Sequence, residues 1–263
     1  MKDNLSRTAI IILAAGDGKR MGSSRPKVMT PLKGKPLIDH VVSHVESSKV
    51  AAMPIVVVSP KHTEVQDYLG TRAWYVMQPE QLGTGHAVRM AEPALKGHAD
   101  HVIVLYGDMP FLREASIRRL AEAHVAAKAV VSIMTVVTPD FADWRSAFQT
   151  FGRIVRNGKG EIERIVEFKD ANEEELKIKE LSTCYFCFDA PWLWEHLQKL
   201  SNSNEQKEYY LTDLVGMAIA EGRTINSVPV DLIEAVGVNS QKDLAVVQNL
   251  SFPTTIGNPK LHN

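Results

Sequence analysis

A glycine-rich segment follows the first apolar run of the chain. Residues 13–22 read LAAGDGKRMG, and Pro26 and Lys27 come shortly after. Small side chains let backbone N–H groups approach a phosphate chain closely, and Arg20 and Lys27 can neutralise its charge. No Gly-Lys-Ser/Thr closes a Walker loop here, and the dinucleotide fingerprint needs another glycine spacing and a helix that opens on it. The segment by itself predicts a phosphate-binding turn.

A carboxylate follows a second apolar run. Residues 101–106 read HVIVLY, and Gly107, Asp108, Met109 and Pro110 come next. An aspartate after a glycine is often only a turn residue, but here it directly ends a strand-like run. Ligands of α/β sheets bind at the carboxyl ends of strands, where one or two carboxylates can hold Mg²⁺ together with water and phosphate oxygens. We therefore interpret Asp108 as a candidate metal ligand.

The two cysteines of the chain, Cys184 and Cys187, form a Cys-x-x-Cys pair. This spacing occurs in redox and zinc sites, but here it lies in an apolar, strand-like run, where positions three apart point to opposite faces. The chain has no second ligand pair to complete a zinc site. We predict a structural role for both cysteines.

Apolar runs of strand length alternate with helical patterns through the first half of the chain. The expected strands are residues 8–13, 54–59, 73–77, 101–106 and 130–137, and the expected helices are residues 36–45, 63–69, 85–95 and 114–127. Alternation of this kind predicts an α/β fold with a mostly parallel central sheet and helices on both faces. The loops after Leu13, Met77 and Tyr106 are the places where a ligand is expected.

The rhythm changes after Pro139. Residues 153–156 and 161–168 are expected to pair as a hairpin around the turn at residues 157–160, followed by a charged stretch, a strand at 183–188 and helices near 192–200 and 213–221. We expect one domain over residues 1–250, with a first part at about 1–138 and a smaller lobe at 139–238 that continues the same sheet. Residues 251–263 are expected to form a tail.

Composition excludes several classes of function. The 263 residues carry 30 Lys and Arg against 31 Asp and Glu, a formal charge of −1, so no global charge favours a nucleic-acid partner. The longest apolar run near the N-terminus is far shorter than the ~20 residues of a membrane span, and no signal-peptide cleavage region follows it. We expect a cytoplasmic protein without a membrane partner.

The motifs together resemble a known family. LAAGxGxRM followed by PK is similar to the signature of the sugar nucleotidyltransferase superfamily. Further strings resemble the N-acetylglucosamine-1-phosphate uridylyltransferase family, the pyrophosphorylase half of a bifunctional bacterial enzyme. They are QPEQLGTGHA (78–87), YGDMP (106–110), FGRI (151–154), IVEFKDA (165–171), EYYLTD (208–213) and GVN (237–239). The strings follow the order of the family over residues 8–245, and they imply the Rossmann-like fold of nucleotide-diphospho-sugar transferases.

The resemblance implies an activity and a set of site residues. The implied reaction is Mg²⁺-dependent transfer of UMP from UTP to N-acetylglucosamine 1-phosphate, giving UDP-N-acetylglucosamine and pyrophosphate. Arg20, Lys27 and Asp108 are implied to be catalytic, and Asp108 with Asn239 to hold Mg²⁺. The residues implied to bind the nucleotide are Leu13, Ala14, Ala15, Gly16, Gly18, Lys27, Gln78, Gln81, Gly83, Thr84, Tyr106, Gly107 and Asp108. Those implied to bind the sugar are Gly152, Glu167, Ser182, Tyr209 and Asn239.

Within the implied uracil site, Gln78 and the backbone of Gly83 and Thr84 are expected to hold the base. Gln81 can either contact the nucleotide or support the loop. For His86 we favour support of the loop over direct catalysis.

Two positions depart from the family pattern. Ser182, Thr183 and Cys184 stand where the family usually has Asn-Thr-Gly against the sugar, and Lys207 stands where a glycine usually precedes Glu-Tyr-Tyr. Loss of a buried amide partner costs roughly 1–3 kcal/mol, which is enough to weaken one acceptor or to favour another. The bifunctional members continue into an acetyltransferase β-helix that forms trimers. No such repeats occur here, so we expect neither that activity nor that module, although a homo-oligomer stays possible.

Three alternatives to this function remain open. A different sugar 1-phosphate is suggested by Ser182 and Cys184. A sugar-nucleotide-binding protein that senses rather than catalyses is less compatible with Lys27, Asp108 and Asn239, because a pure binder has less need of a metal pair. An oxidoreductase is disfavoured because no acidic residue follows a second strand at the place where a ribose hydroxyl would be bound.

Overall fold

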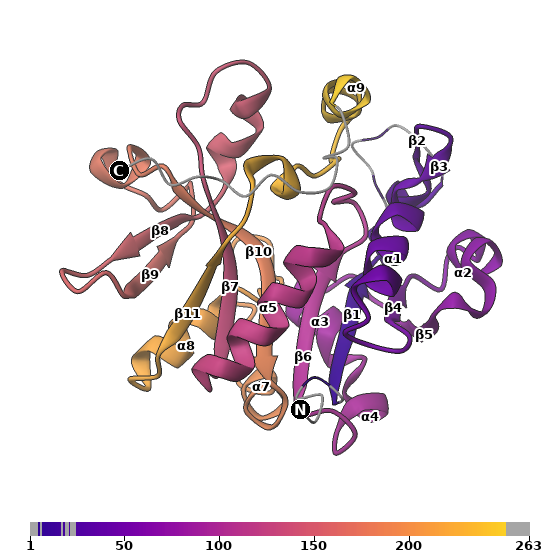
Figure 1. Cartoon of the computed structure of the whole chain (residues 1–263), viewed down its shortest axis with the longest axis horizontal. Coiled ribbons are helices and arrows are strands. Elements are labelled where there is room, and N and C mark those ends of the chain that lie inside the picture. The colour runs from indigo at the N-terminus through magenta and orange to yellow at the C-terminus, as the bar shows by residue number, and fades with distance from the viewer. Residues whose placement is uncertain (1–4, 6, 17, 19–20, 22–24, 251–263) are drawn as a thin grey trace.

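The apolar run at residues 8–13 forms β1 (Thr8–Leu13), which lies inside the main sheet. The computed structural model of the chain describes residues 5, 7–16, 18, 21 and 25–250. Over these residues the main sheet has nine strands, and its path runs β11-β7-β10-β6-β1-β4-β5 (Figure 1). The strands on this path, besides β1, are β4 (Ile55–Val58), β5 (Trp74–Met77), β6 (His101–Tyr106), β7 (Val131–Val137), β10 (Glu180–Asp189) and β11 (Ile225–Pro229).

Most neighbouring strands on this path run parallel, as predicted. β1 pairs in parallel with both β4 and β6, β4 with β5, and β7 with β11. Because helices cover both faces of such strands, β1, β4 and β6 are almost wholly apolar rather than alternating. β10 is the exception, since it runs antiparallel to β6 and to β7.

Helices cover both faces of the sheet and divide the core into two clusters. On one face lie α1 (Leu37–Ser48), α2 (Glu64–Leu69), α5 (Glu114–Ala127) and α9 (Gln241–Asn249), and Figure 1 looks onto this face. On the other face lie α3 (Thr84–Arg89), α4 (Glu92–Leu95), α7 (Ala190–Leu197) and α8 (Asp213–Ala220). A layered arrangement of this kind confirms the predicted fold class.

Local sequence explains where the long helices begin and end. In α1, Leu37, Val41 and Val45 recur at intervals of four and are completely or almost completely buried. The helix ends at Lys49, whose φ of 54° is left-handed, and α5 ends in the same way at Lys128 with a φ of 48°. At these left-handed residues the helices end and the chain turns back toward β4 and β7.

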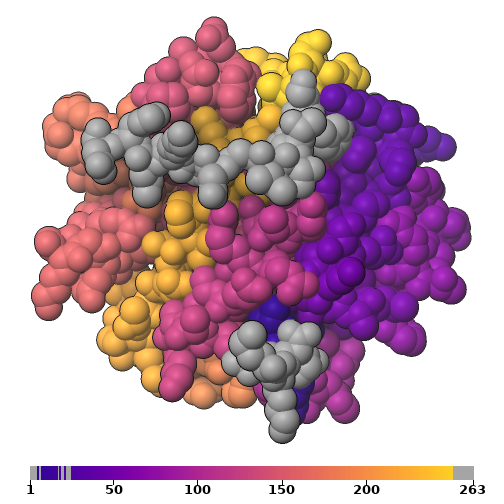
Figure 2. Space-filling model, viewed as in Figure 1, coloured from indigo at the N-terminus to yellow at the C-terminus, as the bar shows by residue number. Residues whose placement is uncertain are grey.

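The remaining elements are a hairpin, a short helix and the connections. β8 (Arg153–Arg156) and β9 (Ile162–Val166) form the predicted hairpin, which joins the main sheet through a single pair between Leu181 and Arg153. Figure 2 shows this hairpin projecting at the left edge, and α6 (Glu173–Leu176) follows it in the chain. Short 3₁₀ turns are η2 (Lys27–Met29), η3 (Gly70–Arg72), η4 (Asp143–Thr150) and η5 (Leu232–Ala235), and β2 (Pro31–Leu32) pairs with β3 (Lys35–Pro36).

Some elements differ from the sequence-based expectation. The single helix expected at residues 85–95 is two helices, α3 and α4, because the chain breaks at Met90 and Ala91 before Pro93 enters the first turn of α4. β11 and α9 were not predicted. Cys184 and Cys187 belong to opposite core clusters, as expected for a strand, and both are free thiols. Among the described residues, no helix combines the length and the apolar character that crossing a membrane requires.

The parallel strands bring the predicted ligand-binding loops to one edge of the sheet. Leu13 at the end of β1 pairs with Tyr106 at the end of β6 and with Val57 of β4. Met77 at the end of β5 pairs with Val58. The glycine-rich segment, the Gln78 loop and Asp108 therefore meet at the carboxyl edge of the sheet, where α/β proteins bind ligands.

Candidate active site

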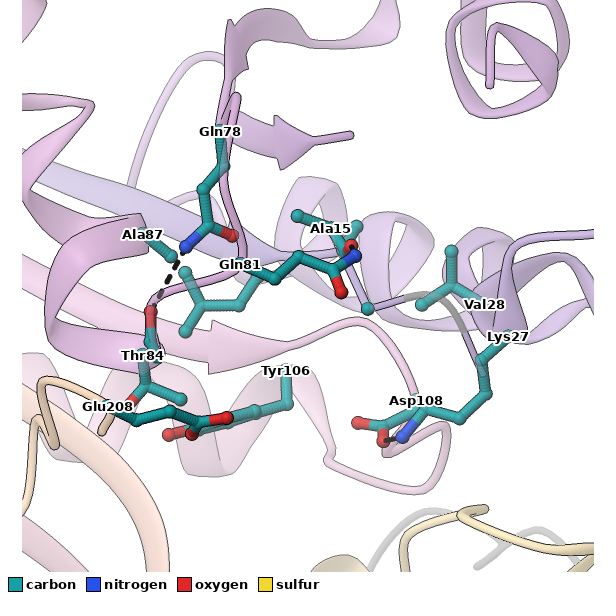
Figure 3. Close-up of a pocket in the computed structure, with 14 residues that line it drawn as sticks. Ala15, Lys27, Val28, Gln78, Gln81, Thr84, Ala87, Tyr106, Asp108 and Glu208 are labelled. Carbon is teal, nitrogen blue, oxygen red and sulfur yellow. Dashed lines mark hydrogen bonds and ion pairs between the residues drawn. The ribbon is translucent and has the colours of Figure 1, made fainter. Parts of the chain in front are cut away.

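Two adjoining cavities open at the carboxyl edge of the sheet. The first, of about 240 Å³, is drawn in Figure 3. It is lined by Leu13, Ala14, Ala15, Gly16, Lys27, Val28, Gln78, Gln81, Gly83, Thr84, Ala87, Tyr106, Asp108 and Glu208. The second has a volume of about 510 Å³ and shares Tyr106 and Asp108 with the first. The molecule thus has two compartments that meet at one carboxylate.

The floor of the first cavity is the end of β1 and the start of the glycine-rich segment. The Ala14 N–H donates to the Val57 carbonyl at 2.9 Å, which continues the strand ladder into the loop. Gly18 has a φ of 63°, and a side chain there would place its Cβ 2.8 Å from the Cβ of Lys27. Glycine at this position therefore lets the loop lie against the backbone that carries Lys27. Arg20 lies outside the described residues.

The Gln78 loop closes the opposite side of the cavity. Gln78 Nε2 donates to the Gly83 carbonyl at 3.1 Å and to His86 Nδ1 at 3.1 Å. Gln81 Nε2 donates to the Ala15 carbonyl at 2.6 Å, and Figure 3 shows Gln81 reaching across to Ala15. These bonds join the predicted base-binding loop to the glycine-rich segment.

His86 has the supporting environment that we favoured for it. It is 7% exposed, and burial, followed by the charge of Arg89, lowers its pKa, so the neutral ring accepts the bond from Gln78. It does not appear among the described residues that line either cavity. Its contacts orient Gln78 rather than a substrate atom.

Gly83 and the chain around Tyr209 fix the loop from the side of α8. Gly83 has a φ of 101°, and a Cβ on it would lie 2.7 Å from the Tyr209 carbonyl oxygen. The Tyr209 N–H donates to the Leu82 carbonyl and its carbonyl accepts from the Gly85 N–H, both at 2.8 Å. Thr84 Oγ1 accepts from the Leu211 N–H at 3.0 Å. The EYYLTD string therefore supports the first cavity.

Lys27 lies where the two cavities meet. Its ammonium group donates to Asn239 Oδ1 at 2.7 Å and forms an ion pair with Asp108 Oδ2. The side chains of Lys27 and Asp108 are only 16% and 12% exposed, so water screens this pair weakly. Figure 3 shows the two side chains pointing toward one another at one end of the cavity. The structure thus brings three of the predicted catalytic and metal-binding residues into direct contact.

Four of the five predicted sugar-binding residues line the second cavity: Gly152, Glu167, Ser182 and Asn239. The Glu167 side chain remains accessible at the cavity wall. Surrounding protein atoms raise its pKa through desolvation, and the charges of Asp170 and Asp213 raise it further. A carboxylate at this wall can accept hydrogen bonds from sugar hydroxyls.

Cys184 occupies the wall beside Glu167 with an unusual backbone. Its φ of 63° lies in the left-handed region, which glycine adopts without strain and other residues rarely do. The Cys184 N–H donates to Ser182 Oγ at 3.4 Å. Burial and the charge of Glu167 raise the pKa of the Cys184 thiol to about 12, so the side chain is neutral. Lys207, at the second departure from the family pattern, is left-handed too, with a φ of 53°.

The structure also places some predicted residues elsewhere. Tyr209 lines neither cavity over the described residues, and its ring lies 5.2 Å from the guanidinium carbon of Arg89. This position does not support the predicted sugar contact for Tyr209. Gly107 lies behind the lining, where its N–H donates to the Leu13 carbonyl at 3.0 Å.

Several lining residues escaped sequence reasoning. Glu208 lines the first cavity, although the motif that contains it drew attention only to the tyrosine. Phe148 and Phe151 line the second cavity from η4 and the residue after it, a stretch with only part of one recognisable motif. From sequence alone, the aromatic residues around η4 are expected to lie in the hydrophobic core. Only the string FGRI could therefore have indicated that this segment lines the second cavity.

Comparisons with known proteins agree with this geometry. Residues 10–167 match the MobA-like NTP transferase domain. The bifunctional protein GlmU of Clostridium botulinum (strain Eklund 17B / Type B) is 39% identical over 240 residues, which is 91% of this chain and 51% of that protein. GlmU of Shouchella clausii (strain KSM-K16) is 41% identical over 239 residues, 89% of this chain and 50% of that protein. The chain spans about half the length of the curated relatives it matches.

A solved structure shares the fold. A Bacillus anthracis protein, described as a glucose-1-phosphate thymidylyltransferase and crystallised with sucrose, aligns with a TM-score of 0.71 over 94% of this chain and 98% of that one. Its 18% identity shows similarity of fold alone. The relatives at 39% and 41% identity confirm the resemblance predicted from the motifs. The chain belongs to the MobA-like NTP transferase family.

Proposed function

We propose that this chain is a sugar-1-phosphate nucleotidyltransferase that transfers UMP from UTP to N-acetylglucosamine 1-phosphate and releases pyrophosphate. The observation that carries the proposal is the pair of cavities that share Asp108 and Tyr106. Nucleotidyl transfer requires two anionic substrates to be held end to end, and the shared residues lie where their phosphates would meet. The choice of uracil and of the amino sugar rests on the resemblance of the motifs.

The first cavity suits the nucleotide. Small side chains from Leu13 to Gly16 leave room for phosphates, and the Gln78 loop presents amides and a backbone around a flat space. Because the Nε2 atoms of Gln78 and Gln81 are already bonded within the protein, we expect much of the base contact to come from the backbone at Gly83 and Thr84. This arrangement pre-forms the loop before a base enters.

The chemical step needs positioning and charge rather than a general base. An oxygen of the sugar phosphate, already anionic, would attack the α-phosphorus of UTP in line with the departing pyrophosphate. Lys27 forms an ion pair with the shared carboxylate and would hold phosphate oxygens on either side of the reacting phosphorus. No covalent intermediate with the protein is expected.

Asp108 and Asn239 suit a Mg²⁺ ion. Their Oδ2 and Oδ1 atoms converge on one cation, the Lys27 ammonium, so the same oxygens can face a metal ion. Within the described part of the chain no cluster of three or more His, Cys, Asp or Glu could hold a metal, so such an ion would take its other ligands from phosphate and water. When bound, Mg²⁺ would neutralise charge that develops on the phosphates.

The proposal is tested by following pyrophosphate release from the purified chain with UTP and a panel of sugar 1-phosphates. N-acetylglucosamine 1-phosphate is expected to give the highest kcat/KM, and replacing UTP by ATP, CTP or GTP to lower it. Clear turnover of another sugar without turnover of the amino sugar would reject this acceptor. Binding of UDP-sugar without any pyrophosphate would instead indicate the sensing function.

A second candidate keeps the reaction but changes the acceptor sugar. It is favoured by one observation, the Cys184 side chain at the wall of the larger cavity beside Ser182. A thiol there takes volume and offers no amide to an acetamido group, so a different substituent on the sugar ring could fit better. If Ser182→Asn with Cys184→Gly leaves the order of acceptors in the panel unchanged, this candidate fails.

A further inference from the structure

Among the described residues, Arg153 is the largest of the side chains that are almost completely buried, with 1% of its surface exposed. Over the described residues no carboxylate forms an ion pair with it, and its Nε atom has no hydrogen-bond partner. Burial without a counter-charge lowers the pKa of Arg153 and is costly for any cation. Because burial of this charge is costly, we expect Arg153 to contribute to the function of a neighbouring site.

The side-chain contacts of Arg153 go to residues that line the larger cavity or lie next to its lining in the chain. Nη1 donates to the Phe151 carbonyl, which directly precedes Gly152 at the cavity wall. The guanidinium carbon lies 5.7 Å from the centroid of the Phe168 ring, and Phe168 directly follows Glu167 of the same wall. Cation–π contact and one hydrogen bond therefore tie one side chain to two segments of this wall.

A third contact extends this arrangement to the segment before η4. The guanidinium carbon lies 5.0 Å from the centroid of Phe141, and the Lys179 ammonium approaches the same ring at 4.2 Å. η4 follows Phe141 and supplies Ser146, Ala147, Phe148 and Thr150 to the cavity. Arg153 thus approaches both rings and the Phe151 carbonyl, so it contacts three parts of the chain that border one cavity.

The backbone of Arg153 lies at the junction of three strands. It pairs with Val166 of β9 and with Leu181 of β10, and the neighbouring Gly152 carbonyl accepts from the Ser182 N–H at 2.9 Å. β8 meets β10 only at this point. Any shift of the Phe151–Gly152 peptide would therefore move Ser182 and Glu167 relative to one another.

We propose that Arg153 is a positioning residue for the acceptor cavity, where its guanidinium group fixes the Phe151–Gly152 wall against the segment that carries Glu167. The inference rests on the proposed function for the identity of the cavity as the acceptor site. It assigns Arg153 no contact with substrate, since its buried side chain does not line either cavity. Arg153 instead fixes the position of the cavity wall, and the wall must be in position before a sugar can bind.

A matched pair of variants separates this role from general stability. Arg153→Met keeps an unbranched aliphatic side chain and removes the charge and the donors. Arg156→Met is the control, because Arg156 lies on the same strand but binds Glu180 and Ser227, away from the cavity. Both full-length variants are compared with the unmodified chain.

The first readout is hydrogen exchange at the Ser182 amide, which needs no turnover. In Arg153→Met this amide is expected to exchange at least about tenfold faster, while Arg156→Met leaves it unchanged. The second readout compares the KM values of the two substrates. Arg153→Met is expected to raise the acceptor KM by about tenfold, whereas the UTP KM should change by less than about twofold. Arg153→Lys, which retains a charge and a donor, is expected to give intermediate values.

Phe168→Ala is the second test, because Phe168 is 39% exposed and we expect the variant to fold. It should raise the acceptor KM in the same direction by a smaller factor, and it decides the matter if Arg153→Met does not fold. Unchanged Ser182 exchange in Arg153→Met, or equal increases in both KM values, would overturn the proposal. If the unmodified chain turns over no acceptor, the proposed function fails, whereas Ser182 exchange still decides the role of Arg153.

Discussion

The Lys27 ammonium donates a hydrogen bond of 2.7 Å to Asn239 Oδ1, although 212 positions of chain separate the two residues. The bond joins η2, close to the glycine-rich segment, to the loop between η5 and α9. The Asn239 N–H donates in turn to Asp243 Oδ2 at 2.9 Å, and the Val238 N–H to the Asp108 carbonyl at 2.9 Å. The site is therefore formed by residues that follow the first strands together with residues from the C-terminal part of the described chain.

This relationship predicts that Lys27 and a divalent cation compete for the same oxygens. Lys27→Met should bind Mn²⁺ several-fold more tightly than the unmodified chain when no nucleotide is present, because the ammonium no longer neutralises Asp108. The same variant should lose at least about 10²-fold in kcat, because it lacks the charge that stabilises the transferred phosphate. Electron paramagnetic resonance of free Mn²⁺ measures the first effect.

Asp108→Asn is the matched control for this competition. It retains the side-chain shape but removes the negative charge, so it should weaken Mn²⁺ binding in the presence and in the absence of Lys27. Weaker Mn²⁺ binding by Lys27→Met than by the unmodified chain would show that the lysine does not compete with the metal.

Gly83→Ala should impair nucleotide binding. The new Cβ would lie 2.7 Å and 2.8 Å from the carbonyl oxygen and the nitrogen of Tyr209, and the φ of 101° disfavours any side chain. Because the displaced loop is bonded to Gln78, we expect the UTP KM to rise by about tenfold or more. Gly97→Ala isolates the cost of the backbone angle, since Gly97 has a φ of 80° but nothing within 4 Å of its Cβ. Equal UTP KM values in the two variants would contradict the role of the Gly83 contact.

Elements whose pattern is strong and local were predictable from the sequence. The run at residues 101–106 and the helix at residues 114–127 occur at the predicted bounds, because each combines a clear apolar period with clear ends. The direction of β10 was not predictable, since an apolar run carries no information on whether its neighbours run parallel. β11 reads INSVP, with too few apolar residues to indicate a strand.

The site was predictable in its residues more than in its geometry. Motif strings located Lys27, Asp108 and Asn239, but only the fold shows that one ammonium group contacts both oxygens. The place of Tyr209 outside the lining of both cavities was not predictable, because a motif gives a position and not the direction of a side chain. The left-handed backbone at Cys184 was not predicted, since cysteine rarely adopts it, and the one indication was the glycine that the family usually has at this position.

Cys184→Gly should not destabilise the chain. The left-handed φ of 63° costs a non-glycine residue roughly 1–2 kcal/mol, whereas glycine loses about 0.5–1 kcal/mol through the entropy of the unfolded chain. We therefore expect the free energy of unfolding, measured in urea, to stay constant or to rise by up to about 1 kcal/mol. Cys187→Gly, in the core, should lower it. A clear loss of stability in Cys184→Gly would show that the thiol packs more favourably than the backbone angle suggests.

Acceptor binding should weaken in acid because of Glu167. Desolvation, followed by Asp170 and Asp213, raises the pKa of this carboxyl above 4.5, so it becomes protonated at a higher pH than an ordinary glutamate. Since the ionised form accepts hydrogen bonds from sugar hydroxyls, the acceptor KM should rise as the pH falls through this raised pKa. Glu167→Gln should have a several-fold higher acceptor KM at neutral pH and a flatter profile. A profile that is the same with and without Glu167 would exclude it from acceptor binding.

The most direct test of the central claim is mass-spectrometric detection of products from the purified chain with UTP, N-acetylglucosamine 1-phosphate and Mg²⁺. The shared position of Asp108 between two cavities predicts UDP-N-acetylglucosamine and pyrophosphate in equal amounts, and no sugar nucleotide from the Asp108→Ala variant. Absence of any sugar nucleotide with every acceptor and every nucleoside triphosphate, from a folded chain that binds UTP, would contradict nucleotidyl transfer.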